Sequence, residues 1–99
     1  MSILVQKFGG TSVANPERIK SIAEKIAKFA SQGNQIVVVV SAMSGETNKL
    51  INLAEEMMSL PEPREMDSIV STGEQVTSGL TALALINLGI KAKSYAGHQ

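Results

Sequence analysis

Hydrophobic positions in the first third of the chain follow two different periods. Ile3–Phe8 is a short apolar-rich run that ends in two glycines, which is typical of a strand meeting a tight turn. After Asn15 and Pro16, a helix cap followed by proline, hydrophobic residues recur every three or four positions until Gly33. The pattern therefore predicts a strand and then an amphipathic helix. The apolar stripe of that helix consists of Ile19, Ile22, Ala23, Ile26, Ala27 and Ala30.

The next apolar run, Ile36–Val40, is β-branched throughout and shows no alternation. Such a run is typical of a central parallel strand that is covered on both faces. A small polar loop from Ser41 to Thr47 follows, and the pattern then predicts a helix over about residues 48–59. The expected buried stripe of this helix consists of Leu50, Leu53, Ala54 and Met57, and we expect Met58 also to fill core space.

A helical pattern resumes at Arg64, with an expected interruption around Ser71–Gly73. The segment Leu80–Leu88 is apolar almost all round, so it needs cover on more than one side. Gly89 then ends the helix, and Lys91–Ala96 is expected to form a last strand. This order of elements predicts an α/β chain, namely a layered α/β/α fold with a mainly parallel sheet and right-handed crossovers.

Composition excludes several classes of function. Nine Lys and Arg residues balance nine Asp and Glu residues, so the chain has no net charge that would attract nucleic acid or an anionic membrane. Cysteine is absent and His98 is the single histidine, which excludes thiol catalysis and a metal site built on these ligands. No signal peptide and no membrane-spanning run is present in the sequence, so we expect a cytoplasmic protein.

The first loop with candidate chemistry contains Lys7, Phe8, Gly9 and Gly10 at the end of the first strand. Ligands of open α/β sheets bind beyond the carboxyl ends of the strands. Two glycines let backbone amides approach a phosphate closely, and the Lys7 ammonium adds a positive charge. The order of residues differs from both the Walker A loop and the dinucleotide-binding fingerprint. The alternative is a plain turn that ends the strand.

Two further loops contain polar residues whose function the pattern leaves open. The hydroxyls of Ser41 and Thr47 can bind a polar substrate, or one of them simply caps the next helix. Glu74 can bind an ammonium group. The alternative there is that Thr72 caps a helix, with Gln75 at the capping-box position.

Taken together, these motifs resemble the aspartokinases of the amino acid kinase superfamily. Residues 5–13, VQKFGGTSV, are similar to the opening signature of that family, and residues 38–43, VVVSAM, resemble its second-strand loop. Residues 64–67, REMD, followed by 71–74, STGE, resemble its third segment, and residues 97–99, GHQ, match the start of a further turn. The resemblance extends over the whole chain, in order and at similar spacing.

The resemblance implies transfer of the γ-phosphoryl group of ATP, bound with Mg²⁺, to the side-chain carboxylate of aspartate. The product is aspartyl phosphate, and its formation is the first step toward lysine, threonine and methionine. Aspartate and ATP are thus the expected ligands, and a homo-oligomer or association with the rest of the kinase is expected. The implied site residues are Lys7 and Ser41 for catalysis, Lys7, Phe8, Gly9 and Gly10 for the nucleotide, and Thr47 and Glu74 for aspartate.

Gln99 precedes the positions at which the family has its nucleotide-binding segments and ACT domains. We therefore expect residues 1–99 to be an incomplete, N-terminal segment of a kinase domain, inactive and prone to self-association when alone. Two alternatives stay open. One is a kinase of another amino acid, such as glutamate, and the other is a non-catalytic binding or assembly module that uses Leu80–Leu88 as an interface.

Overall fold

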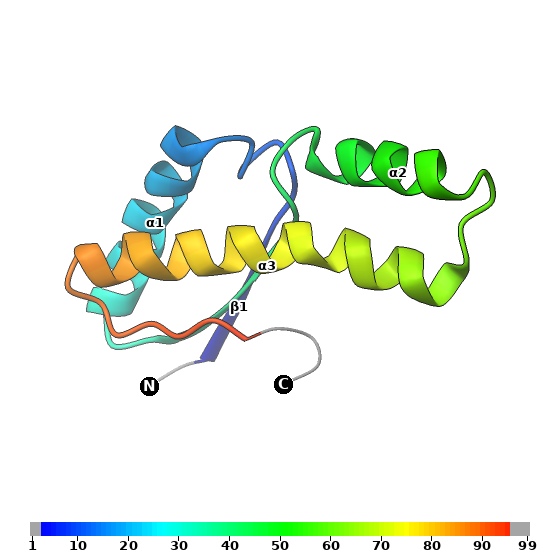
Figure 1. Cartoon of the computed structure of the whole chain (residues 1–99). Helices are drawn as coiled ribbons and strands as arrows, with labels where there is room; N and C mark the ends of the chain where they lie inside the picture. The colour runs from blue at the N-terminus through cyan, green and yellow to red at the C-terminus, as the bar shows by residue number, and fades with distance from the viewer. Residues whose placement is uncertain (1–2, 96–99) are drawn as a thin grey trace.

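The computed structural model of the chain describes residues 3–95. This part of the chain folds into two parallel strands and three helices, which confirms the α/β class (Figure 1). In chain order the elements are β1 (Ile3–Phe8), α1 (Pro16–Ser31), β2 (Gln35–Val40), α2 (Glu46–Met57) and α3 (Pro63–Asn87).

The strands β1 and β2 pair directly, with Lys7 opposite Val39 and Phe8 opposite Val40. Parallel strands need a crossover connection, and here α1 provides it. Because both strands run in the same direction, their carboxyl ends lie at one edge of the sheet. The two loops that follow β1 and β2 therefore start as neighbours at that edge.

The two faces of this sheet have different surroundings. On one face, here called the covered face, the side chains are half-buried beneath α1 and α3: Leu4, Gln6, Phe8, Ile36, Val38 and Val40. On the other, here called the open face, the side chains are exposed: Ile3, Val5, Lys7, Gln35, Val37 and Val39. Val37 is 51% exposed, so within residues 3–95 the second strand is covered on one face and not on both. Of the expected three layers, the described residues therefore contain the sheet and one layer of helices.

The covered face builds the core together with α1. Ile19, Ile22, Ala23 and Ile26 are buried, which confirms the apolar stripe of this helix. The Asn15 side chain caps α1 by accepting a hydrogen bond from Arg18 N at 2.9 Å, as its position before proline predicts. Such a cap satisfies one of the first N–H groups of the helix, and it fixes where the loop after β1 ends.

The helix α3 runs unbroken through Ser71–Gly73, so the expected interruption is wrong. Thr72 lies in the helix interior, where its Oγ1 donates to Ile69 O at 2.6 Å, and it caps nothing. Glu62 caps this helix instead, by accepting from Glu65 N. Serine, threonine and glycine are poor helix formers, but Ser71 and Thr72 bond their hydroxyls to helix carbonyls and Gly73 packs closely against Ala42.

The segment after α3 differs from its expectation. Gly89, with a φ of 86°, ends the helix as predicted, and Ile90 N donates back to Leu85 O at 3.0 Å. Residues 91–95 do not form a strand, and Ala96 lies outside the described residues. The packing of Ile90 and Ala92 against the core positions this segment, in place of hydrogen bonding to β2.

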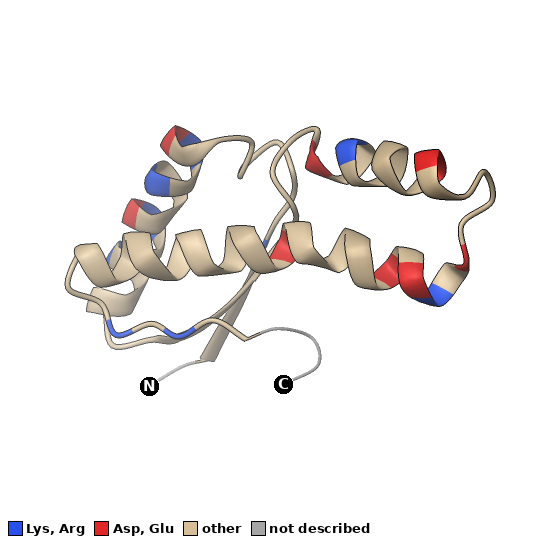
Figure 2. Ribbon diagram, viewed as in Figure 1, with Lys and Arg blue, Asp and Glu red and all other residues tan. Residues whose placement is uncertain are grey.

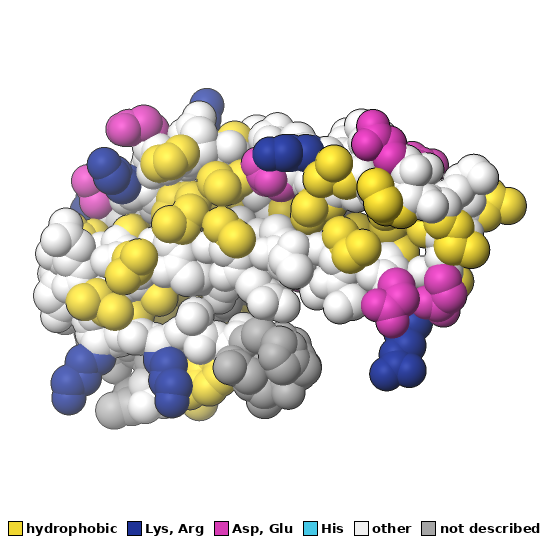
Figure 3. Space-filling model, in the orientation of Figure 1, with side chains coloured by type: hydrophobic (Ala, Val, Ile, Leu, Met, Phe, Trp, Pro, Cys, Tyr) yellow, Lys and Arg dark blue, Asp and Glu magenta, His cyan; other side chains and the backbone are white. Residues whose placement is uncertain are grey.

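The molecule is elongated, 50 × 26 × 18 Å, because α2 and the N-terminal half of α3 extend beyond the sheet (Figure 1). In α2 only Ala54 is buried, whereas Leu53 is 51% and Met57 82% exposed. Figure 3 shows hydrophobic side chains at the surface over this pair of helices. The expectation that Met57 and Met58 fill the core is thus wrong for the described structure. No helix in residues 3–95 has the length and apolar character needed to cross a membrane.

Candidate functional site

The loops after β1 and β2 are joined at the shared edge of the sheet. Ser41 N donates to Phe8 O at 3.1 Å, which continues the strand pairing by one residue. One step further, Gly10 faces the backbone of Ala42: a Cβ at Gly10 would lie 3.6 Å from Ala42 O. The first two candidate loops therefore form one surface.

The third candidate segment reaches the same place from α3. Ala42 is buried, and its Cβ lies 3.0 Å from the position that a Cβ would occupy at Gly73. Leu50 Cδ1 and Glu46 Cβ, from the first two turns of α2, lie 3.6 and 3.9 Å from that position. Three segments that are more than thirty residues apart along the chain thus meet around Ala42.

Neither Ser41 nor Thr47 caps α2, so that alternative reading of the second loop is wrong. The N-cap is Gly45, whose φ of 83° favours glycine and which offers no side chain to cap the helix. Glu46 N donates to Met43 O at 3.1 Å, and Thr47 lies in the first turn. A helix N-terminus carries partial positive charge and unpaired N–H groups, so this end of α2 can receive an anion.

The turn after β1 is held by two hydrogen bonds, from Ser12 N and Val13 N to Gly9 O, at 3.0 and 3.2 Å. Val13 is fully buried, which anchors the turn to the core. Neither Gly9 nor Gly10 has a positive φ, and no atom of the described chain lies within 4 Å of a Cβ placed at Gly9. Backbone conformation and packing within residues 3–95 therefore do not require glycine here. An external group that approaches the backbone closely would require it.

Lys7 and Phe8 point to opposite faces of the sheet. The Phe8 ring packs into both clusters of core residues, so Phe8 could contribute to a nucleotide site only through its main chain. Lys7 is exposed on the open face, opposite Val39. At the end of β1, the Phe8 side chain therefore packs in the core, and the Lys7 side chain is accessible to a ligand.

Glu74 is exposed and directly follows Gly73 in α3. It lines a cleft of about 580 Å³ between α3 and the end of β2, together with Arg64, Asp67 and Ser71. Val39, which pairs with Lys7 across the two strands, lines the same cleft. The structure therefore brings Gly10, Ser41 and Gly73 together around Ala42, with the first two turns of α2 beside them, and it places Glu74 at the neighbouring cleft.

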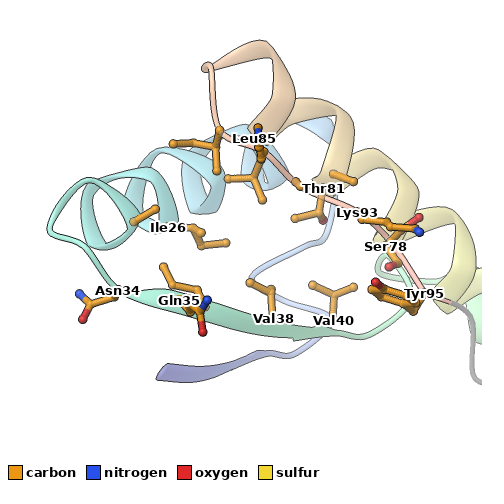
Figure 4. Close-up of a pocket in the computed structure, with 17 residues that line it drawn as sticks. Ile26, Asn34, Gln35, Val38, Val40, Ser78, Thr81, Leu85, Lys93 and Tyr95 are labelled. Atoms are coloured by element: carbon orange, nitrogen blue, oxygen red, sulfur yellow. The ribbon is translucent and has the colours of Figure 1, made fainter. Parts of the chain in front are cut away.

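A second cavity, of about 460 Å³, lies beneath α3 and is shown in Figure 4. Its walls are apolar side chains of the covered face and the helices, such as Val38 and Leu85, and the segment that ends at Tyr95 closes one side. The hydroxyl of Thr81, which lines the cavity, already donates to Thr77 O at 2.8 Å. None of the candidate site residues lines this cavity, and we assign it no function.

Charged residues are unevenly divided between the elements. Residues 1–50 contain six Lys and Arg against three Asp and Glu, and residues 51–99 contain three against six. In Figure 2, carboxylates mark the right-hand end of α3, while Lys and Arg gather on α1 and the segment after α3. Within residues 3–95, no three His, Asp or Glu side chains come close enough together to hold a metal ion.

Sequence reasoning identified the three loops but missed Ala42, the residue that connects them. It also interpreted Gly73 as a break in a helix. The available signal was a glycine inside an otherwise helical pattern, which costs about 1 kcal/mol relative to alanine and often has a packing reason.

Comparison with known proteins supports the family expected from the motifs. The model of the amino acid kinase family matches residues 2–99. The chain is 60% identical over 99 residues to an aspartokinase of Pseudomonas aeruginosa, and 61% identical to an aspartate kinase of Stutzerimonas stutzeri. In both cases the match covers all of this chain and 24% of the relative, so the chain spans about a quarter of their length.

The fold agrees with these sequence matches. The crystal structure of aspartate kinase from Synechocystis superposes with a TM-score of 0.84 at 49% identity, over 87% of this chain and 15% of that one. The family model matches residues 2–99, and most of the chain has the same fold as the aspartate kinase structure. The chain belongs to the amino acid kinase family, and within that family it is similar to the aspartokinases.

Proposed function

We propose that this chain forms the aspartate-binding side and part of the phosphate-binding side of an aspartate kinase active site. The observation that carries the proposal is the meeting of three separate candidate segments around Ala42, at the carboxyl edge of a parallel sheet. The names of the similar proteins supply the substrate, aspartate, and the reaction class, phosphoryl transfer.

In this reaction a carboxylate oxygen of aspartate forms a bond to the γ-phosphorus of ATP. The bond from that phosphorus to the bridging oxygen breaks, and the electron pair leaves with ADP. The attacking carboxylate is already ionised, so no strong base is needed, and the protein acts by positioning and by charge stabilisation. Aspartyl phosphate would be the product, as an early step of amino-acid biosynthesis in the cytoplasm.

The phosphate side of the site would be formed by the turn after β1. Gly9 leaves open space in front of the backbone, and Gly10 adjoins the second loop. Backbone N–H groups there would approach the phosphates, and the exposed Lys7 ammonium would stabilise charge that gathers on the transferring group. Mg²⁺ would arrive with ATP, since Mg²⁺ commonly binds through substrate phosphates and one or two carboxylates.

The aspartate side would be formed by the second loop and α3. Ser41 directly precedes Ala42 and Thr47 lies in the first turn of α2; both are half-buried, and their hydroxyls suit the substrate carboxylates. The uncapped N-terminus of α2 favours the same negative groups. Glu74, exposed at the neighbouring cleft, would bind the substrate ammonium.

A chimera tests the proposal directly, because the chain matches 99 residues of the longer Pseudomonas aeruginosa aspartokinase. In the chimera, this chain replaces those residues. With ATP and Mg²⁺, we expect it to convert aspartate into an acyl phosphate, which hydroxylamine traps as a hydroxamate. Glutamate serves as the control substrate.

The parent enzyme and this chain alone are assayed in parallel, and we expect hydroxamate from the parent and none from the chain alone. A chimera that unfolds cooperatively, as the parent does, but makes no hydroxamate would contradict the proposal. A preference for glutamate would instead support the alternative of a kinase for another amino acid.

A further inference from the structure

The helix α3 contains two glycines in its interior, and they have different surroundings. Among residues 3–95, no atom outside the adjoining helix backbone lies within 4 Å of a Cβ placed at Gly79. A Cβ at Gly73 would lie 3.0 Å from Ala42 Cβ, which is closer than the 3.5–4.0 Å at which carbon atoms pack best. An interior glycine destabilises a helix, so its presence at a crowded position indicates that the close approach itself is needed.

The close approach at Gly73 fixes three segments relative to one another. Ala42 is held on its other side, because its carbonyl faces Gly10 and the N–H of the preceding residue donates to Phe8 O. Leu50, on the second turn of α2, also lies within 4 Å of the Gly73 Cβ position. A displacement of Ala42 away from α3 would therefore shift its own loop, Ser41–Thr47, which leads directly into α2.

We infer that Gly73 is a positioning residue, whose missing side chain sets the spacing between Glu74 and the loop Ser41–Thr47. This inference rests on the proposed function, because its expected consequence is a change in the binding of aspartate between these two elements. An added methyl group has to move Ala42 by a few tenths of an ångström. Glu74 and the loop Ser41–Thr47, which are proposed to bind aspartate, directly adjoin Gly73 and Ala42 in the chain, whereas the glycine turn proposed to bind ATP meets Ala42 only at its carbonyl oxygen.

The test uses a pair of compensating substitutions. Gly73→Ala adds the methyl group, and Ala42→Gly removes the atom that it would contact. Gly79→Ala is the matched control, since it makes the same change in the same helix where space is open. In the chimera we expect Gly73→Ala to raise the aspartate KM about tenfold, while the ATP KM changes less than about twofold. Gly79→Ala leaves both KM values unchanged.

In the Ala42→Gly background, Gly73→Ala should raise the aspartate KM by less than about twofold, because the two sites are in direct contact and their effects do not add. The inference is overturned if Gly73→Ala leaves the aspartate KM unchanged, or if Ala42→Gly gives no rescue. If Gly73→Ala alone does not fold, the double variant decides: its folding supports the contact, and its failure overturns it.

A second readout separates this inference from the proposed function. In the isolated chain, amide chemical shifts of residues 41–47 should move in Gly73→Ala and return toward their original values in the double variant. If the chimera has no aspartate kinase activity, the proposed function fails. The shifts then still decide the inference, because unmoved shifts at residues 41–47 overturn it.

Discussion

The covered and open faces of the β1–β2 sheet consist of alternating residues of the same two strands, yet they do different things. Covered positions such as Phe8 and Val38 pack against α1 and α3 and hold the sheet to the helices. Open positions such as Lys7 and Val39 contact no core cluster within residues 3–95. The two-residue period of a strand thus lets one short segment stabilise the fold with one face and present chemistry with the other.

Phe8 and Lys7 make this contrast at adjacent positions. The Phe8 ring joins both core clusters, and its carbonyl accepts the hydrogen bond that ties the second loop to the first. The Lys7 side chain lies on the open face at the strand end, where α/β sheets bind ligands. Substitutions at these two residues should therefore affect different measurements.

The largest effect is expected for Phe8→Ala. Removing a phenyl ring that packs in a core typically lowers the free energy of unfolding by about 3–5 kcal/mol, through lost burial and a residual cavity. That is a large fraction of the whole stability of a small domain. Urea unfolding of the chain measures it.

Val5→Ala is the control for Phe8→Ala, since Val5 lies on the same strand but is exposed on the open face. We expect it to change the free energy of unfolding by less than about 0.5 kcal/mol. Phe8→Leu keeps most of the packing and should cost about 1 kcal/mol, which gives a measurable value if Phe8→Ala does not fold. Equal losses at Val5 and Phe8 would show that the open face is also packed.

Lys7→Met is expected to have the next largest effect, on the rate of the chimera. Removing one preorganised group that stabilises charge in the transition state typically lowers kcat by about 10²–10³, or roughly 3–4 kcal/mol. Methionine keeps the apolar stem, so the melting temperature should stay the same. The aspartate KM should move far less than kcat, because the ammonium acts mainly in the transition state.

Lys20→Met is the matched control, because Lys20 is an exposed lysine on α1 and belongs to none of the three candidate segments. It should leave kcat unchanged. A normal kcat in Lys7→Met would show that Lys7 is an ordinary surface lysine at the end of a strand and has no role in the proposed mechanism.

Much of the fold could be predicted from local signals. The three- and four-residue spacing in α1, the Asn15 cap and the terminal Gly33 and Gly89 all lie within one element, and all are confirmed. The single covered face of β2 could not be predicted, because an all-β-branched run looks the same whether one face or both are packed. The unbroken α3 was missed because the local propensity of Ser71–Gly73 opposes a helix that tertiary packing stabilises.

The three candidate segments of the site were predicted from the sequence. The contact at Ala42 that joins them was not. Residues of a motif, such as Lys7 and Glu74, can be recognised in the sequence by their type and spacing. Ala42 has no such signal, since a small apolar residue in a loop has many possible neighbours. Its contact with Gly73 joins residues thirty-one positions apart and depends on how α3 crosses the loop, which only the folded structure shows.

The smallest effect is expected for a pair of valine substitutions that separates the two faces within β2. Val38→Thr and Val39→Thr both keep the β-branched shape, so they differ mainly in where the new hydroxyl lies. On the covered face the hydroxyl loses water, and burying it without a partner costs about 1–3 kcal/mol, toward the lower end because Val38 is half-buried. On the open face it stays hydrated, and the free energy of unfolding should change by less than about 0.5 kcal/mol.

Urea unfolding of the isolated chain compares the two variants, and equal losses would contradict the assignment of faces. In the chimera the same comparison tests the expected third layer: if further chain packs over the open face there, Val39→Thr becomes as costly as Val38→Thr.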